Sequence, residues 1–592
     1  MPAKPSLAEL QRYPDMARWF NPALLLKLLW RVVVADLFGQ YADRRLIEAA
    51  LDTVPEGEIV ERAANAIAAT PDSEGAVWVD FVADLGDGFD ATYAIASLLG
   101  QNELVVDGHR LPRGAAVVMG GDEVYPTSSR QDYKRKTQDP YSFAFPDRKV
   151  APHPRILAIP GNHDWYDGLV TFLAFFCRAR PTRFGQWRTN QRRSYFAAKV
   201  SDGCWLWAID IALVEDMDQP QADYFEAIAR AMPQGANIIL CSAEPGWYNA
   251  QQNSDSFRTL SYAAWIAENA ARALRIPLIL SGDTHHYSRY SGPHGSQYIT
   301  SGGGGAFLHG THGLPGEIHA DWLRDSNAVL SLKTAPEEDH QPVPDPVCWP
   351  SKAESRRLLW GNLKFPLLNW DFALLLGGVY WLLAFAMSQL PRGDVYALAA
   401  VLLAAGFIAY AGYQEGWTLK VIGLSLVHAA LHVAALFLLL ALLHRIDAQF
   451  LQLRSGPWWA WFIAMALFFI PFGGMVAASL FGLNLLVTCM WFDMNHNDAF
   501  SAMRLFDYRH FLRIRILGDQ ITVYAVGLRH VPRRNAWRDN PASAADPAAP
   551  YFIADGMVPH LIERPIVISG WKVPTTAETK TPSELPRGAG AR

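Results

Sequence analysis

The stretch ILAIPGNHDWYDGL, residues 156–169, runs from an apolar, strand-like segment into a Gly-Asn-His-Asp turn. An amide, an imidazole and a carboxylate therefore follow one another at the end of a predicted buried strand. Four further apolar runs between residues 76 and 286 end in the same way, in polar side chains. These runs alternate with helix-like segments, and such alternation is typical of an α/β domain.

The polar side chains at these five strand ends form one predicted site. In chain order they are Asp84, Asp87, Asp122, Tyr125, Asn162, His163, Asp164, Glu244, Asp283, His285 and His286. Ligands of open α/β sheets collect at the carboxyl ends of the strands, so we expect these residues to converge. Carboxylate and amide oxygens together with imidazoles suit a pair of divalent or trivalent ions such as Mn, Fe or Zn.

The order Asp…GD…GNHD…GDTHH resembles the pattern of the calcineurin-like metallophosphoesterase superfamily over about residues 75–310. The resemblance implies a metallophosphoesterase sandwich and two metal ions that share Asp122, with Asn162 on the second ion. It also implies that His163 contacts the phosphoryl group and assists the leaving group, and that Asp164 orients His163. In such a site two cations lower the pKa of a bridging water, and the resulting hydroxide attacks phosphorus.

The first motif departs from the family pattern. It reads Asp-Leu-Gly at residues 84–86, so the histidine ligand of the family is missing. Purple acid phosphatases lack the same histidine and use a tyrosine three residues after the bridging aspartate. Tyr125 stands three residues after Asp122 and would favour a ferric ion there, although a tyrosine at a strand exit also serves simply as packing.

Two later motifs are altered as well. Glu244 lies where the family has a lone histidine, and its carboxylate is a candidate ligand of the second metal. In GDTHH, Asp283 and His285 align with the two histidines of the family, which leaves His286 as a neighbour. More carboxylate and less imidazole favours manganese or iron over zinc. A pseudo-enzyme that has lost its site is the alternative.

Basic residues near these motifs are candidates for substrate contacts. Arg192 and Arg193 lie in a strand-like run and are predicted to bind a substrate phosphate, with a solvated or salt-bridged arginine as the alternative. The insert at residues 125–145 is basic and predicts a lid, a membrane-surface patch or an ordinary loop.

The second half of the chain is predicted to span a membrane. Four segments lack Asp, Glu, Lys and Arg and reach the roughly 20 residues that a spanning helix needs. They are Phe372 to Pro391, Val395 to Gln414, Val421 to Leu443 and Pro457 to Phe492. Pro471 marks either a kink or a turn between two spans in the last one, and loop charges favour four spans over five. His428 and His432 share one helical face as a functional site or as a neutral hydrogen-bonded pair.

These patterns divide the chain into six predicted regions. They are an N-terminal helical segment (1–70), the metallophosphoesterase domain (71–332), a proline-rich linker (333–370), a transmembrane domain of about four helices (371–492), a C-terminal region with a β-hairpin (493–574) and a disordered tail (575–592).

Composition bounds the compartment and the partners. The five cysteines form no CxxC spacing, which suits a reducing compartment, and no secretory signal opens the chain. Basic residues flank the predicted spans on one side. We therefore expect a multi-pass protein of the cell membrane whose catalytic domain faces the cytoplasm. A net charge of -5 carries no nucleic-acid signature.

The predicted function is hydrolysis of a phosphomonoester or phosphodiester by a membrane-anchored enzyme with two divalent or mixed-valence metal ions (Mn, Fe or Zn). A lipid-linked ester is one candidate substrate, inferred from location alone. The alternative is a membrane transporter or sensor with a non-catalytic phosphoesterase-like domain. The sequence leaves substrate identity and oligomeric state open.

Overall fold

The structure is a computed structural model, and it divides into two compact units. The sheet unit contains Met1–Ala17, Arg31–Ser351 and Phe506–Arg592, and the helical unit contains Arg18–Trp30 and Lys352–Leu505. The described residues are 4–39, 44–68, 70–146, 153–211, 217–250, 254–322, 325–334, 346–389, 393–546 and 548–569. The predicted disordered tail and the middle of the predicted linker, 335–345, lie outside them.

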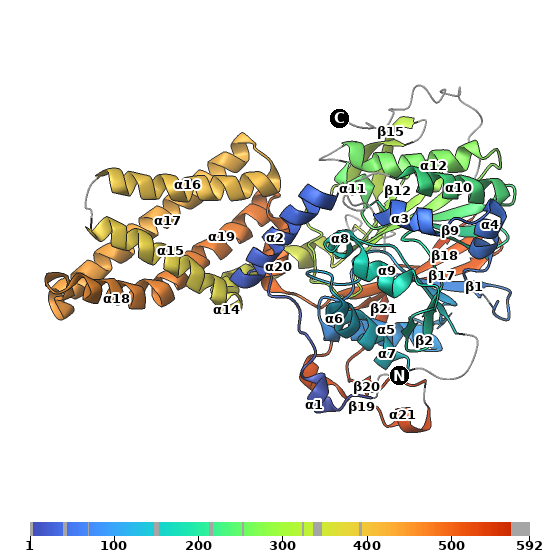
Figure 1. The fold of residues 1–592 in the computed structure, drawn as a ribbon, viewed down its shortest axis with the longest axis horizontal. Helices are drawn as coiled ribbons and strands as arrows, with labels where there is room; N and C mark the ends of the chain where they lie inside the picture. Colours follow the sequence, from blue (N-terminus) through green and yellow to red (C-terminus); the bar gives the residue numbers. More distant parts are fainter. Residues whose placement is uncertain are drawn as a thin grey trace, which may run out of the picture. The chain divides into compact units, whose positions relative to one another are not determined.

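Two nine-stranded sheets build the sheet unit (Figure 1). The first has the order β21-β18-β17-β1-β4-β5-β7-β6, with β22 beside β18. Its strands are β1 (Val77–Val82), β4 (Ala116–Met119), β5 (Arg155–Ala158), β6 (Arg183–Phe184), β7 (Trp187–Thr189), β17 (Arg509–Leu517), β18 (Gln520–Leu528), β21 (Pro559–Leu561) and β22 (Ile566–Ile568).

The second sheet has the order β14-β15-β12-β13-β11-β10-β9-β8, with β16 beside β12. Its strands are β8 (Phe196–Ser201), β9 (Cys204–Ile209), β10 (Asn237–Ser242), β11 (Arg275–Ser281), β12 (Tyr287–Ser291), β13 (Gln297–Ser301), β14 (Glu317–Trp322), β15 (Asp325–Leu332) and β16 (Cys348–Trp349). Two small sheets pair β2 (Glu103–Val106) with β3 (His109–Pro112), and β19 (Arg538–Asp539) with β20 (Phe552–Ile553).

Alternating side chains make these sheets the two inner layers of a sandwich. In β1, Val79 and Phe81 point into a core shared with the second sheet, whereas Trp78 and Val82 belong to a separate core on the outer face. Residues of α5 and α7 complete that outer core, and residues of α10 and α12 cover the other sheet (Figure 1). The predicted α/β sandwich is confirmed.

The helices of the sheet unit are mostly short. They are α1 (Leu7–Leu10), α3 (Arg44–Leu51), α4 (Glu56–Ala64), α5 (Phe89–Leu99), α6 (Arg130–Asp132), η1 (Tyr133–Gln138), α7 (Asp139–Ala144), α8 (Asn162–Trp165), α9 (Val170–Phe176), α10 (Gln219–Ala231), α11 (Gly246–Asn249), η2 (Ser254–Phe257), α12 (Arg258–Asn269), η3 (Pro293–Gly295), η8 (Arg534–Ala536) and α21 (Ala542–Ala545).

The predicted C-terminal hairpin is present as β17 and β18, and it belongs to the first sheet rather than to a region of its own. Strand β17 pairs antiparallel with β1 along five residue pairs. The buried Arg513 of β17 donates to both Asp80 oxygens at 2.7 and 3.0 Å and to the Leu111 carbonyl at 3.0 Å. Because its guanidinium is fully buried, this ion pair ties the strand firmly to β1.

Among its described residues, the helical unit contains four helices long and apolar enough to cross a membrane: Trp370–Gln389, Tyr396–Glu415, Leu419–Leu451 and Trp458–Trp491. Its elements are α13 (Lys352–Leu358), η4 (Leu359–Lys364), α14 (Phe365–Leu368), α15 (Trp370–Gln389), α16 (Gly393–Glu415), α17 (Leu419–Ile446), η5 (Asp447–Leu451), η6 (Leu453–Ser455), α18 (Trp458–Phe468), η7 (Phe469–Gly473), α19 (Gly474–Phe492) and α20 (His496–Met503). Helix α2 (Pro22–Gly39) is divided between the two units.

The last apolar segment is one helix interrupted by a π-helical turn. The turn, Phe469–Gly473, contains Pro471, which has no backbone N–H to donate. A π-turn absorbs such a defect without ending the helix. The four-span prediction is therefore confirmed by length and composition, and the segment does not fold back as two spans.

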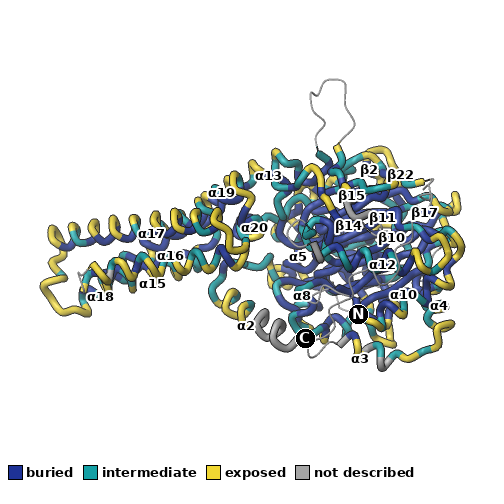
Figure 2. The backbone as a smooth tube through the Cα atoms, turned by 90° about the horizontal axis from the view of Figure 1, so that it is seen from above, coloured by how far each residue is buried: buried dark blue, intermediate teal, exposed yellow. Residues whose placement is uncertain are grey.

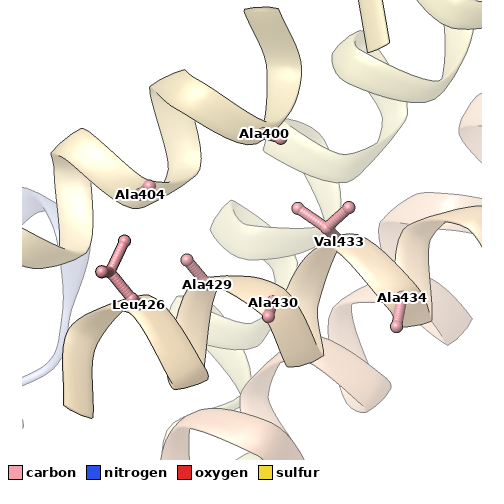
Figure 3. Close-up of a pocket in the computed structure, with 7 residues that line it drawn as sticks. All are labelled: Ala400, Ala404, Leu426, Ala429, Ala430, Val433 and Ala434. Carbon is pink, nitrogen blue, oxygen red and sulfur yellow. The ribbon is translucent and has the colours of Figure 1, made fainter. Parts of the chain in front are cut away.

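Helix surfaces in this unit suit a lipid environment. In Figure 2, α16 and α17 carry exposed residues along their length, and Leu402 and Leu438 are 55% and 71% exposed. Between the same two helices lies an apolar cavity of about 390 Å³ (Figure 3). Its lining is Ala400, Ala404, Leu426, Ala429, Ala430, Val433 and Ala434. This lining supplies no group for chemistry.

The histidine pair of α17 forms a short hydrogen-bonded chain with α15. The Tyr380 hydroxyl lies 2.8 Å from His432 Nδ1, and His432 Nε2 lies 2.9 Å from His428 Nε2. The Phe407 ring packs on both imidazoles, with centroid distances of 4.1 and 4.8 Å. This is the arrangement of the neutral hydrogen-bonded alternative.

Candidate metal centre

Strand order explains why distant motifs meet. Strands β1, β4 and β5 are parallel neighbours in one sheet, and β10 and β11 are parallel neighbours in the other. Their carboxyl ends carry the predicted residues. Asp84, Asp122 and Asp283 each adopt a left-handed backbone, with φ of 59°, 54° and 67°. Such strain in non-glycine residues clusters at functional sites, because the surrounding fold must hold it in place.

The Tyr125 hydroxyl is the hub of the site. It lies 2.8 Å from Asp84 Oδ1, 2.8 Å from Asp122 Oδ2 and 2.9 Å from His285 Nε2. The other nitrogen of the His285 ring, Nδ1, lies 2.7 Å from the Phe307 carbonyl, so in the neutral ring Nδ1 carries the proton and Nε2 is an acceptor. When both carboxylates are ionised, one hydroxyl proton therefore faces three acceptors.

These distances match the spacing of ligands around one cation. Ligand atoms roughly 2.1 Å from an ion and at right angles to each other lie about 3.0 Å apart. The three contacts of the hub fall close to this value, and His285 Nε2 lies 3.6 Å from Asp84 Oδ1. Residues from β1, β4 and β11 thus fit a cation, which would satisfy the acceptors that a single proton cannot.

The electrostatics of the centre also call for positive charge. Burial, and then repulsion from Asp164, raises the pKa of Asp122 to about 8. Burial together with the charge of Asp122 raises the pKa of Asp283 to about 7. The pKa of Asp84 is raised well above its usual range by burial and by the charges of Asp122 and Asp283. Buried carboxylates without counter-ions must take up protons or metal ions.

The GNHD segment supplies a second set of oxygens. Asn162 Oδ1 is buried and makes no hydrogen bond to any residue that the structure describes. The Asp122 carboxylate is shared, because Oδ2 faces Tyr125 and Oδ1 accepts from the His163 amide at 2.9 Å. A buried amide oxygen without a donor beside a shared carboxylate is what a second metal position requires.

The ring of His163 is oriented by a backbone group. Its Nδ1 lies 2.9 Å from the Pro126 carbonyl, so this nitrogen carries the proton and Nε2 is the acceptor in the neutral ring. Burial lowers the pKa of His163, while the Pro126 carbonyl and the Asp164 and Asp283 carboxylates oppose that shift. The hydrogen bond that the sequence assigns to Asp164 is thus made by Pro126.

The Asp164 carboxylate instead closes the turn. It accepts from the amides of Gly161 at 2.9 Å and Glu123 at 3.2 Å, and from the hydroxyl of Tyr133. Burial raises the pKa of Glu123, whose carboxyl lies against Asp164, and the charge of Asp164 adds to the effect. This cluster fixes the GNHD turn relative to the segment that carries Asp122.

Three predicted ligands are not joined to the hub by the described contacts. Asp87 is buried and accepts from the Ala17 amide at 2.9 Å, although its charge acts on His163. Glu244 is half-buried, and its carbonyl accepts from Gly246. The His286 carbonyl accepts from Gly302 at 3.3 Å, and it is the ring of the preceding histidine that meets Tyr125.

The two predicted phosphate-binding arginines make no described contact with the residues of the hub. Arg192 is exposed. Arg193 donates to the Tyr195 hydroxyl at 2.9 Å and to the Asp52 carbonyl at 3.0 Å. Arg193 thus matches the salt-bridged alternative, and a phosphate contact stays a prediction without support from these distances.

Sequence reasoning missed several residues around the centre. The basic insert forms α6, η1 and α7 and is buried in part, although Arg130 and Lys134 are exposed: Lys136 donates to the Tyr125 carbonyl at 2.5 Å, and Thr137 donates to the Glu123 carbonyl. His309 stacks on His285 with ring centroids 4.2 Å apart. Arg509 of β17 lies near Asp84 and Asp87 and carries a buried positive charge. In the insert, the available signal for burial was Lys136 with Tyr133 one helical turn before it.

Comparisons with known proteins agree with this site. The sequence model of the family described as calcineurin-like phosphoesterase matches residues 77–287, so the chain carries a calcineurin-like phosphoesterase domain. The matched segment begins with β1 and reaches the first residue of β12, and it contains all five strand ends. Members of this family generally bind divalent metals.

No curated protein matches the chain. Eight chains of solved structures do. One of them, titled "GAP50 the anchor in the inner membrane complex of Plasmodium", is 14% identical over 40% of this chain and 74% of that chain, with a TM-score of 0.29. A likeness of that size carries no argument about fold or function here.

Proposed function

We propose that the protein is a membrane-anchored, metal-dependent phosphoesterase that hydrolyses a phosphomonoester or a phosphodiester with two divalent or mixed-valence ions. The observation that carries the proposal is the hub, where the Tyr125 hydroxyl meets Asp84, Asp122 and His285 at 2.8 to 2.9 Å. One position would use these four side chains. The other would use the remaining oxygen of Asp122 together with Asn162.

Bound cations would neutralise the carboxylates, polarise the phosphoryl group and lower the pKa of a bound water. The chain's own residues supply the rest. Pro126 holds the His163 ring through Nδ1, and Nε2 would take or give a proton at the leaving oxygen. The Asp283 carboxylate interacts electrostatically with His163 and Asp122.

The location of the four apolar helices guides the choice of substrate. A domain tied to a membrane bundle meets phosphoesters at the bilayer surface, so a lipid-linked ester is the first substrate class to test. The basic residues that flank the spans support a cytoplasmic orientation of the phosphoesterase domain.

The proposal is tested by metal analysis and turnover of the full chain in detergent. We expect about two metal ions per chain by elemental analysis, and hydrolysis of p-nitrophenyl or bis-p-nitrophenyl phosphate with Mn, Fe or Zn supplied. Asp122→Asn should abolish both metal binding and turnover. His163→Ala should retain metal and lower kcat by about 10²- to 10⁴-fold.

Matched controls are the exposed Asp202→Asn and His109→Ala, which should behave as the wild type. Turnover unchanged by both Asp122→Asn and His163→Ala would overturn the enzyme as drawn. Bound metal without any turnover would instead favour a sensor or transporter with a non-catalytic domain.

A further inference from the structure

The glycine loop, residues 302–307, holds two members of the hub. The amide of Ala306 donates to the Asp84 carbonyl at 2.9 Å, and the amide of Gly304 donates to the Ala83 carbonyl at 2.9 Å. The carbonyl of Phe307 fixes the His285 ring at 2.7 Å. Displacing this loop would therefore move a carboxylate and an imidazole together.

Two neighbours on β17 hold the glycine loop. Arg509 is fully buried and donates through Nη1 to the Ala306 carbonyl, while Nε and Nη2 donate to the Asp507 carbonyl at 3.1 and 2.9 Å. The His510 amide donates to the Gly303 carbonyl at 3.2 Å. A Cβ at Gly303 would overlap the His510 ring, so only glycine lets the loop approach the strand this closely.

The positive charge of Arg509 interacts with carboxylates near the glycine loop. Burial lowers the pKa of this guanidinium to about 10, and the carboxylates of Asp507, Asp87 and Asp84 oppose the shift. It remains a cation at neutral pH. A buried guanidinium donating to two carbonyls at once holds a fork geometry that an ammonium group cannot reproduce.

We propose that Arg509 is a positioning residue of the metal centre, which acts through the glycine loop on Asp84 and His285. The strand that carries it begins three residues after Phe506, where the chain re-enters the sheet unit. The matched phosphoesterase segment, residues 77–287, is therefore incomplete as a site without this later strand. The role in turnover rests on the proposed function, whereas the role in loop order does not.

The test compares Arg509→Met and Arg509→Lys in the full chain. Hydrogen exchange of the glycine loop and Mn²⁺ affinity are measured, with turnover recorded separately. We expect Arg509→Met to speed exchange at Gly304 and Ala306 and to weaken Mn²⁺ binding by about 10- to 100-fold, as loss of a partner behind metal ligands does. Arg509→Lys should recover part of both, because one ammonium reaches one carbonyl only.

Two further variants separate positioning from general damage. Arg515→Gln, on the same strand with its partner Glu74 at the surface, should change neither quantity. Gly303→Ala disturbs a neighbouring contact of the same loop, with His510 rather than with Arg509, and should also speed exchange in the loop and weaken Mn²⁺ binding with the guanidinium intact. It also covers the case in which Arg509→Met does not fold.

Unchanged loop exchange in folded Arg509→Met and Gly303→Ala would overturn the proposal. The proposal would also be overturned if Arg509→Met and Arg515→Gln had the same Mn²⁺ affinity. Absence of turnover in the wild type would count against the proposed function alone, because loop exchange and Mn²⁺ affinity do not depend on catalysis.

Discussion

One buried hydrogen-bonded chain of the helical unit has balanced donors and acceptors, whereas the polar groups at the candidate metal centre do not. In the helical unit, the Tyr380 hydroxyl can donate to His432 Nδ1, and His432 Nε2–H can donate to His428 Nε2, so each donor has its own acceptor. At the candidate metal centre, the one proton of the Tyr125 hydroxyl faces three acceptors when Asp84 and Asp122 are ionised. A buried site in which hydrogen-bond acceptors outnumber donors suits a cation. A buried chain in which each donor has its own acceptor is complete without a ligand.

The largest effect should follow from Tyr125→Phe, which removes the hub oxygen. We expect Mn²⁺ affinity to fall at least about 10-fold, because Asp84 and Asp122 lose the group that fixes their spacing. Isothermal titration with Mn²⁺ measures this. With iron bound, the variant should also lack any phenolate absorption band.

Tyr141→Phe is the matched control, since the Tyr141 hydroxyl is buried and makes no hydrogen bond within the described part of the chain. It should bind metal like the wild type. Equal Mn²⁺ affinities of Tyr125→Phe and Tyr141→Phe would show that Tyr125 is not a metal ligand, and the contrast between the two regions would not hold.

A smaller effect is expected in the pH dependence of the metal-stripped protein. The pKa values of Asp122, about 8, and Asp283, about 7, lie above those of unfolded aspartate. From the pKa of unfolded aspartate, about 4, up to these folded pKa values, the folded state binds more protons than the unfolded state. The free energy of unfolding therefore falls as pH rises through this range, up to about pH 8. We expect Tm to drop by about 5 °C between pH 6 and pH 8.5.

Differential scanning fluorimetry across this range provides the measurement. Saturating Mn²⁺ should flatten the profile, because the cation replaces the protons, and Asp122→Asn should make it shallower without metal. A stripped wild-type protein that gains stability up to pH 8.5 would contradict the charge imbalance inferred for the centre.

The smallest effect is expected in the helical unit. His432→Leu should lower the free energy of unfolding by about 1 kcal/mol, in the range of hydrogen bonds between membrane helices. Because the pair is neutral and matched, metal content and turnover should stay as in the wild type. Loss of one metal equivalent in this variant would show that the helical unit holds a site of its own.

Much of this organisation was predictable from the sequence. Apolar runs that end in polar residues and alternate with helix-like segments predicted an α/β domain, and the family resemblance implied the sandwich. Long charge-free segments predicted the four helices. The structure brings Asp84, Asp122, Tyr125 and His285 into contact, and their role as metal ligands stays a prediction. These residues follow strands directly, so the strand pattern alone was enough to gather them.

The remaining parts of the centre carry no comparable signal. Pro126 orients His163 through a carbonyl, which every residue possesses. Arg509 lies beyond four apolar helices in the sequence, and an alternating strand pattern does not say which strand it pairs with. Basic composition does not indicate which side chain of the insert is buried, since Lys136 is buried against the Tyr125 carbonyl whereas Arg130 and Lys134 are exposed.

The pairing of β17 with β1 sets an order for the synthesis of this protein. On the ribosome, β1 emerges long before β17, and until then it is an edge strand with unpaired backbone groups on one side. The four candidate membrane helices of the described residues are all translated between the two strands. The sheet that carries Asp84 and Asp122 is therefore completed only after these four helices have left the ribosome, so a nascent chain cannot assemble the finished candidate centre before the helical unit has been made.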